Sequence, residues 1–205
     1  MRERIGKKLG VNLPQIQPYR ESGIPIIGTF HSVGVYFLRM FIDRIGYARN
    51  FVIFDEDDKV KLVKLILREK GIDEKEVPAK QITAAISSAK NEGLNADGLR
   101  KTAQSYAMSI AADIYVELER RMREMNALDF DDILLKVHEL LKVPEVLAYF
   151  QNRFAYIMVD EYQDTNEIQY QIVKMLGAAS RNVAVVGDDW QGIYSWRGAN
   201  IKNII

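Results

Sequence analysis

The sequence predicts a helix-rich α/β fold in which a parallel sheet is interrupted by a helical insertion. Three short apolar runs, Ile24–Thr29, Tyr156–Asp160 and Val183–Gly187, have the length and composition of buried strands. Between the first and second runs, apolar residues recur at helical spacing over a long segment. Each run ends in a small or polar residue, and ligands of open α/β sheets bind at the carboxyl ends of the strands. We therefore expect the functional site at these strand ends.

The composition limits the classes of protein to which the chain can belong. Its 205 residues are 48% hydrophobic, which suffices for the core of one domain or two small ones. The net charge of zero excludes a strongly basic protein that wraps nucleic acid, but not local basic patches. The absence of cysteine excludes disulfides and cysteine-based zinc sites, and His31 and His138 form no metal-ligand cluster. No apolar run reaches membrane-spanning length and no signal peptide is present, so we expect a cytoplasmic protein with no membrane partner.

The insertion begins with two helices whose ends are marked in the sequence. Asp55 is expected to cap the first helix, whose apolar positions lie within residues 60–67, and Gly71 ends it. Pro78 suits the first turn of the second helix, which stops near Gly93. The inward-facing positions expected for these two helices are Val60, Val63, Ile66, Leu67, Ile82, Ala85, Ile86 and Ala89.

A third, long helix is predicted from about Leu99 to Met125. Its segment 117–124 alternates charges as a solvated helix face does. Pro144 then opens another short helix before the second strand. The residues of the long helix that we expect to face inward are Tyr106, Ile110, Leu118 and Met122.

Asp160 and Glu161 follow directly after the second apolar run. Nucleotide hydrolysis needs one carboxylate to hold Mg²⁺ and a second to orient or deprotonate the attacking water. Adjacent strand residues point to different sides, which suits these two roles. An ordinary charged turn is the alternative for an isolated Asp-Glu pair, but the full string Asp-Glu-Tyr-Gln-Asp-Thr favours the nucleotide site. Asp164 is expected to cap the next helix, with Glu167 completing a capping box.

A second polar loop follows the third apolar run. Gln191, just after the Asp188-Asp189 pair, is placed to reach a terminal phosphate at the same sheet edge. Aromatic rings stack on unpaired bases and arginine contacts the phosphate backbone, so this loop also suits single-stranded nucleic acid. Aromatic residues near a strand also fill cores, which is the alternative for Trp190. The residues with the proposed nucleic-acid role are Tyr194, Trp196 and Arg197.

At these residues the chain resembles the UvrD/Rep/PcrA-type superfamily 1 DNA helicases. Residues 160–166 resemble motif II of that family and residues 187–200 resemble motif III. Residues 28–32, Gly-Thr-Phe-His-Ser, resemble motif Ib, and residues 128–132 resemble the Leu/Met-Asp-Phe-Asp-Asp motif that precedes motif II. Residues 1–5 resemble the helix downstream of motif Ia. The resemblance therefore covers essentially the whole chain, with five motifs in the family's order.

The resemblance implies roles for individual residues. Asp160 would bind Mg²⁺, Glu161 would be the catalytic carboxylate, and Asp188 would lie in the nucleotide site. Gln163 and Gln191 would couple the γ-phosphate of ATP to the DNA site. Residues that would line the single-stranded DNA path are Thr29, His31, Phe130, Tyr194, Trp196 and Arg197.

Three of these DNA-path residues have structural alternatives. His31 can be a helix-start residue packed under the strand, and Phe130 can be a plain core residue. Thr29 at a strand end can simply satisfy backbone groups. Motif III also departs from the family pattern, since Trp190-Gln191-Gly192 stands where Asp-Gln-Ser is usual. This departure weakens the finer assignments in that loop but retains the glutamine.

The family's fold divides the chain into three parts. Residues 1–46 and 127–205 would be parts of domain 1A, an incomplete RecA-like P-loop NTPase domain, and residues 47–126 would be the helical subdomain 1B. No Gly-Lys-Ser or Gly-Lys-Thr phosphate loop occurs in the chain. We therefore expect a fragment whose phosphate loop and second motor domain lie elsewhere in a longer protein.

The resemblance implies an ATP-dependent, Mg²⁺-dependent helicase that moves 3′ to 5′ along single-stranded DNA. Its partners would be single-stranded DNA, junctions of single- and double-stranded DNA, and the remaining helicase domains. The isolated fragment is expected to be inactive as an ATPase, since the phosphate loop is absent. Two alternatives stay open: a non-catalytic module that binds single-stranded DNA or a protein partner, and the helicase part of a recombination helicase-nuclease.

Overall fold

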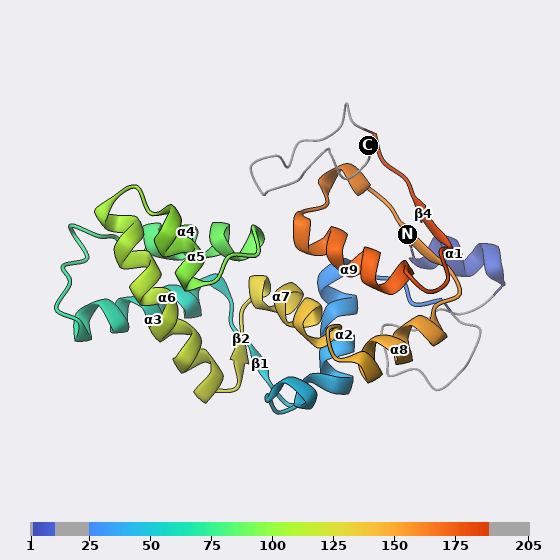
Figure 1. The fold of residues 1–205 in the computed structure, drawn as a ribbon, viewed down its shortest axis with the longest axis horizontal. Coiled ribbons are helices and arrows are strands. Elements are labelled where there is room, and N and C mark those ends of the chain that lie inside the picture. Colours follow the sequence, from blue (N-terminus) through green and yellow to red (C-terminus); the bar gives the residue numbers. More distant parts are fainter. Residues whose placement is uncertain (1, 11–24, 189–205) are drawn as a thin grey trace.

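The computed structural model describes residues 2–10 and 25–188. Figure 1 shows the helices in two groups, with α7 between them. The insertion lobe consists of α3 (Glu56–Glu69), α4 (Ala79–Asn91), α5 (Ala96–Thr102) and α6 (Tyr106–Glu124). The sheet lobe consists of α2 (Phe30–Phe41), η1 (Ile42–Ile45), α7 (Phe130–Leu140), α8 (Pro144–Arg153), β3 (Ile157–Val159), η2 (Tyr162–Asp164), α9 (Glu167–Gly177) and β4 (Val183–Val185). Helix α1 (Arg2–Leu9) lies beside the sheet lobe.

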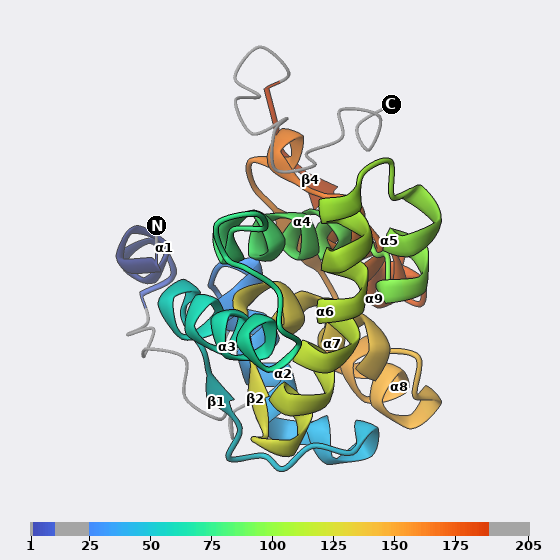
Figure 2. The same cartoon turned by 90° about the vertical axis from the view of Figure 1, so that its left-hand side faces the viewer.

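The insertion lobe has its own apolar core, and Figure 2 views its helices from their outer side. Asp55 caps α3 by accepting a hydrogen bond from the backbone N–H of Asp58 at 2.8 Å, as predicted. Gly71 and Gly93 follow α3 and α4 with φ of +69° and +73°, the left-handed conformation that glycine adopts most readily. The ends at Asp55, Gly71 and Gly93 are therefore confirmed, whereas Pro78 is the extended N-cap residue just before the first turn of α4.

The single long helix predicted from Leu99 to Met125 is wrong. The chain leaves helical geometry at residues 103–105, which separates α5 from α6. Ser105 caps α6 and accepts from the backbone N–H of Met108 at 3.3 Å. This new helix start changes which positions face inward, so the Tyr106 side chain is 70% exposed rather than inward. Leu118 and Met122 are buried as expected, and Ile110 packs partly buried against the core.

The sheet lobe is held by aromatic packing and by close helix contact. The rings of Phe37 on α2 and Phe150 on α8 stack with centroids 3.9 Å apart. Gly34 on α2 faces α7 so closely that a Cβ there would lie 3.1 Å from the Ile133 side chain. The two helices can therefore approach each other directly, and they fix the start of α7 beside the start of α2.

Strands β3 and β4 are parallel and pair Ile157 with Val183 and Val159 with Val185. Their predicted positions are confirmed, but their predicted burial holds only for Val159, because α9 covers one face of this two-stranded sheet. A second parallel pair, β1 (Val52–Ile53) with β2 (Ala127–Leu128), joins the two lobes and was not predicted.

The strand predicted at Ile24–Thr29 is not formed by residues 25–29, while Ile24 lies outside the described residues. Pro25 lacks the N–H that a sheet ladder needs, and Thr29 already serves as the cap of α2. None of the described helices combines the length and the hydropathy needed to cross a membrane.

Candidate functional site

The carboxyl end of β3 presents two exposed carboxylates. Asp160 and Glu161 follow the buried Val159, and both are exposed. Glu161 has φ +52° and ψ +44°, a left-handed conformation that costs a residue with a side chain about 1–2 kcal/mol. The Glu161 N–H donates to the Asp160 carboxylate at 3.1 Å, which supports the turn. A strained, non-glycine residue at a strand end is typical of functional sites.

Gln163 ties the ends of β3 and β4 together. Its side chain is 3% exposed; Nε2 donates to Glu161 Oε2 at 2.7 Å and Oε1 accepts from the Asp188 N–H at 3.0 Å. At Gly187 an added Cβ would lie 2.7 Å from Gln163 Oε1, so only glycine leaves room for this bridge. Three residues predicted for the nucleotide site, Glu161, Gln163 and Asp188, therefore meet at one sheet edge.

The helix after β3 and η2 begins two residues later than predicted. Asn166, not Asp164, caps α9, and its side chain and that of Gln169 form a capping box with bonds of 2.9 Å each way. Asp164 instead ends η2, because the chain makes a tight turn before the helix. Its Oδ1 is buried without a hydrogen-bond partner in the described part of the chain. Burial and the nearby Glu161 charge raise the pKa of Asp164.

The donor set at this edge fits a magnesium ion shared with a nucleotide. Mg²⁺ is usually held by one or two carboxylates, with water and phosphate oxygens completing its shell. Asp160 offers one exposed carboxylate at the strand end. Within residues 2–10 and 25–188, no group of three or more histidine and acidic side chains is placed to hold a metal on its own.

A second feature is an aromatic pair at the adjoining starts of α2 and α7. His31 and Phe130 have ring centroids 5.8 Å apart and planes inclined at 60°. Phe130 is 56% exposed, so it is not a core residue, and His31 is partly buried. Thr29 caps α2, with its hydroxyl accepting from the Ser32 N–H at 3.2 Å. Thr29, His31 and Phe130, the predicted DNA-path residues in the described part of the chain, thus lie together at these helix starts. Thr29 also satisfies a backbone N–H, which was its structural alternative.

The remaining predicted site residues lie outside the described residues. These are Gln191, predicted to reach a terminal phosphate, and the three residues of the same loop predicted to contact nucleic acid; Trp190, the possible core residue, lies outside as well. Their assignments stay predictions. The nucleic-acid residues concerned are Tyr194, Trp196 and Arg197.

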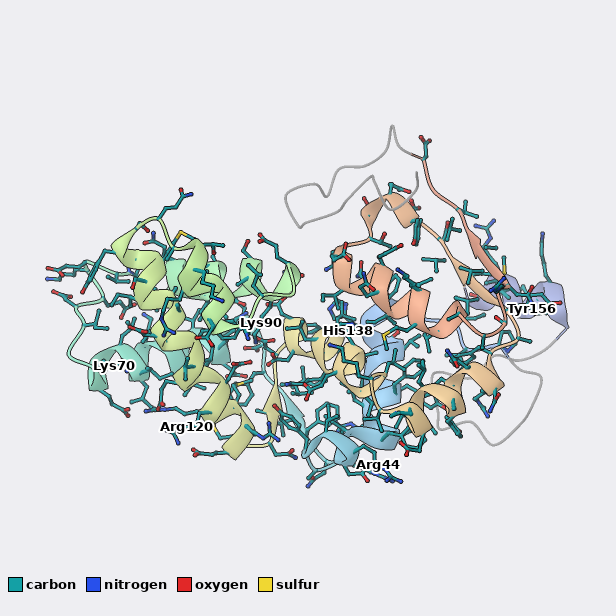
Figure 3. All side chains as sticks on the ribbon, viewed as in Figure 1. Arg44, Lys70, Lys90, Arg120, His138 and Tyr156 are labelled. Atoms are coloured by element: carbon teal, nitrogen blue, oxygen red, sulfur yellow. The ribbon has the colours of Figure 1, made fainter. Side chains whose placement is uncertain are left out.

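The start of α7 is anchored by a buried ionic cluster that sequence reasoning missed. Asp129 and Asp132 form a capping box around Phe130, and both accept from Lys90 Nζ on α4, at 3.0 and 2.6 Å. Lys59 on α3 lies 3.5 Å from both Asp129 and Asp131. Figure 3 shows Lys90 where the insertion lobe meets α7.

The charges of this cluster determine one another. Burial opposes the charge of Lys90, but the aspartates outweigh that effect and raise its pKa. Burial raises the pKa of Asp132 to about 6, whereas the two lysines lower that of Asp129 despite its burial. A signal was present in the sequence, because Lys90 continues the apolar positions 82 and 86 of α4 at four-residue spacing.

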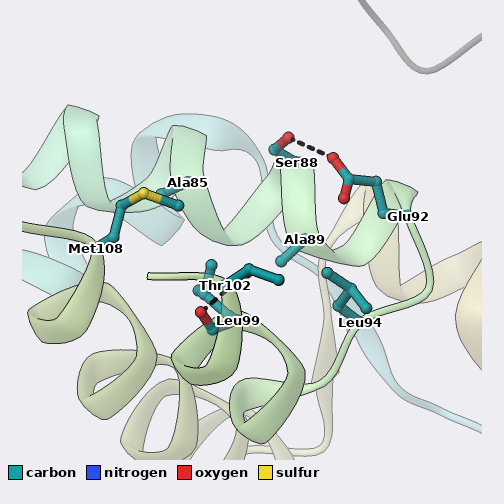
Figure 4. Close-up of a pocket in the computed structure, with 8 residues that line it drawn as sticks. All are labelled: Ala85, Ser88, Ala89, Glu92, Leu94, Leu99, Thr102 and Met108. Atoms are coloured by element: carbon teal, nitrogen blue, oxygen red, sulfur yellow. Dashed lines mark hydrogen bonds between the residues drawn. The ribbon is translucent and has the colours of Figure 1, made fainter. Parts of the chain in front are cut away.

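A pocket of about 210 Å³ lies elsewhere, between α4, α5 and α6 (Figure 4). Its walls are mostly apolar, and its one carboxylate, Glu92, accepts from Ser88 at 3.3 Å. Its lining residues come from the insertion lobe and include no lysine or arginine, and the pocket is separate from the ends of β3 and β4. The lining residues are Ala85, Ser88, Ala89, Glu92, Leu94, Leu99, Thr102 and Met108.

The amino-acid sequence matches a known family and several named proteins. Residues 1–205 match the family described as the UvrD/REP helicase N-terminal domain. Proteins named ATP-dependent DNA helicase PcrA are similar to the whole chain, with 42% identity in Bacillus subtilis (strain 168) and 41% in Staphylococcus aureus (strain Mu50). A PcrA of Staphylococcus epidermidis is 42% identical over 90% of the chain. The chain spans 27% of the length of the first two relatives and 26% of the third.

Proposed function

This chain belongs to the UvrD/REP helicase N-terminal domain family, and we propose that it is part of an ATP-dependent DNA helicase. In this proposal the chain supplies the carboxylates for ATP hydrolysis and part of the path for single-stranded DNA. The observation that carries it is the meeting of Glu161, Gln163 and Asp188 beside Asp160 at one sheet edge. The similar proteins are named as ATP-dependent DNA helicases, which supports the same assignment.

The exposed carboxylates divide the work of hydrolysis in this proposal. Asp160 holds Mg²⁺, which, when bound, neutralises charge on the phosphates. Glu161 orients the attacking water and accepts its proton. The 2.7 Å bond from Gln163 fixes the Glu161 carboxylate, and the bond to the Asp188 N–H fixes Gln163 in turn. Glu161 is thereby held in one orientation while it remains open to water and substrate.

The aromatic pair supports a DNA path on the same protein. An exposed ring such as that of Phe130 can stack on an unpaired base, a contact worth about 1–3 kcal/mol per base. We assign Thr29, His31 and Phe130 to this path, together with the loop residues Tyr194, Trp196 and Arg197, which lie outside the described part. Gln191 in that loop is assigned to the γ-phosphate. Because the phosphate-contacting and DNA-contacting residues would share one loop, ATP hydrolysis would change how tightly the protein holds the DNA strand.

Several finer assignments belong to the same proposal. Movement is 3′ to 5′ in the cytoplasm, and the substrates are single-stranded DNA and its junctions with duplex DNA. Residues 1–46 and 127–205 belong to a P-loop NTPase domain, with residues 47–126 inserted as a helical subdomain. The remaining helicase domains complete the motor. The chain alone does not hydrolyse ATP, because its sequence holds no Gly-Lys-Ser/Thr loop to bind the phosphates.

The test is Glu161→Gln in the full-length protein that contains this chain. Loss of the general base is expected to lower DNA-stimulated kcat for ATP about 10²–10⁴-fold, with the KM for ATP changed little. Glu145→Gln, an exposed glutamate on α8, is the matched control and should retain activity. Full activity of Glu161→Gln would overturn the catalytic assignment. Measurable turnover by the 205-residue chain alone would overturn its proposed inactivity.

A further inference from the structure

Asn91, the last residue of α4, lies at a junction of three helices. Its Nδ2 donates to the Ser87 carbonyl of its own helix at 2.9 Å and to Asp131 Oδ1 on α7 at 3.4 Å. Its Oδ1 accepts from Asn166 Nδ2 at 3.1 Å. A single amide thus connects the insertion lobe with two helices of the sheet lobe.

On one side of this junction lies the nucleotide edge. Asn166 caps α9, is 7% exposed, and ends the 160–166 segment that begins with Asp160 and Glu161. A second contact supports the junction: a Cβ at Gly93, just after α4, would lie 3.2 Å from Ile168 on α9. The end of α4 is therefore packed directly on the first turn of the helix that follows the catalytic carboxylates.

On the other side lies the aromatic pair. Asp131 neighbours Phe130 in the first turn of α7, and the capping box of Asp129 and Asp132 surrounds the same residue. Lys90, 2% exposed, holds both box carboxylates to α4. The first turn of α7 is held to α4 at three carboxylates, those of Asp129, Asp131 and Asp132. A movement of the end of α4 would therefore carry this turn with it, together with the Phe130 ring.

We propose that Asn91 is a positioning residue that couples the nucleotide edge at α9 to the strand-contacting Phe130 through its hydrogen bonds to Asn166 and Asp131. The inference rests on the proposed function, since it names a link between the two sites of that function. Two hydrogen bonds through one amide form the physical connection, from the cap of α9 to the first turn of α7. Asn91 touches neither ATP nor DNA in this role.

The experiment measures how strongly single-stranded oligothymidylate stimulates ATP hydrolysis by the full-length protein. Asn91→Ala is expected to reduce the ratio of DNA-stimulated to basal kcat by about fivefold or more, the lower end of ordinary coupling between sites. Basal kcat without DNA should stay within about twofold, because Asp160, Glu161 and Gln163 keep their contacts. A purely structural role would lower both rates in parallel.

Asn166→Ser is a second variant, which separates the two roles of Asn166: capping α9 and donating a hydrogen bond to Asn91. Serine is also a good cap, so α9 keeps its helix start, but serine has no amide to donate to Asn91. This variant should reproduce the loss of stimulation seen with Asn91→Ala. The double variant should lose no more than either single one, because both remove the same bond.

Asn95→Ala is the matched control for stability. Asn95 caps α5 and accepts from the Gly98 N–H at 2.9 Å, so its loss destabilises the insertion lobe while the junction stays intact. Its DNA stimulation should equal that of the wild type. If DNA stimulates Asn91→Ala as strongly as the wild type, or if Asn95→Ala loses as much stimulation as Asn91→Ala, the inference is overturned while the proposed function stands. A wild-type protein without DNA-stimulated hydrolysis would overturn the proposed function and the inference with it.

Discussion

The two carboxylate clusters of this chain are built in opposite ways. At the end of β3, Asp160 and Glu161 are exposed, and one of them occupies a left-handed backbone conformation. At the start of α7, Asp129 and Asp132 are buried and are held by Lys90 in a capping box. Both clusters stand at the end of a short parallel strand, so the strand alone does not determine the difference.

The two clusters differ in whether positively charged side chains balance their carboxylates. Lysines from two helices of the insertion lobe neutralise the α7 cluster, and a buried charge that loses its partner costs several kcal/mol. The described contacts of the β3 carboxylates are instead a backbone N–H and the neutral amide of Gln163. A carboxylate exposed to water can accept a metal or a proton. The α7 cluster thus fixes the structure, whereas the β3 carboxylates stay open to a ligand.

Lys90→Met should produce the largest loss of stability. The substitution keeps the length of the side chain but leaves two buried aspartates without their main counter-charge, which is expected to cost about 3–5 kcal/mol. Denaturant unfolding of the chain measures the change. Lys80→Met, an exposed lysine of the same helix, is the control and should change the free energy of unfolding by about 0.5 kcal/mol or less. A loss below 1 kcal/mol in Lys90→Met would remove the contrast between the clusters.

This cluster also shows where sequence reasoning stops. Lysine is among the residues least often buried, so a lysine in an apolar helical stripe is easily taken for a surface residue. Its partners lie 39 and 42 residues away, and only the packing of α4 on α7 brings them together. The position of Asp160 and Glu161 at the end of a strand was predicted correctly because strand and acidic pair are contiguous in the chain, while their catalytic role stays a proposal.

The start of α9 illustrates a second limit. Asp164 with Glu167 and Asn166 with Gln169 both have the spacing of a capping box, so the sequence offers two overlapping helix starts. Thr165 bonds back to the Tyr162 carbonyl at 2.7 Å and Asn166 bonds to Asn91, which favours the later start. Likewise, the break before Ser105 interrupts an otherwise continuous helical pattern. Local patterns predicted helices, whereas tertiary contacts selected their ends.

Gln163→Ala should have a smaller effect on stability than Lys90→Met and a distinct effect on catalysis. It removes bonds to Glu161 and to the Asp188 N–H, so unfolding should become easier by about 1 kcal/mol. Under the proposed function the Glu161 carboxylate also loses its fixed orientation, and kcat for ATP hydrolysis by the full-length protein is expected to fall about 10-fold to 100-fold.

Gln171→Ala on α9, whose side chain bonds Glu167, is the matched control for Gln163→Ala and should leave kcat unchanged. Unaltered kcat in Gln163→Ala would mean that the carboxylate at the end of β3 needs no positioning. The open cluster would then differ from the buried one in exposure alone.

Phe130→Ala should have the smallest effect on stability, although Phe130 stands inside the turn that Lys90 and the capping box hold. The ring is 56% exposed, so its removal is expected to change the free energy of unfolding by about 0.5 kcal/mol. Single-strand binding by the full-length protein should nevertheless weaken about 5-fold to 150-fold, the equivalent of one lost stacking contact. Leu65→Ala, an exposed apolar residue of α3, is the control for general loss of surface. If both variants bind alike, the buried cluster anchors a turn but presents no ring to DNA.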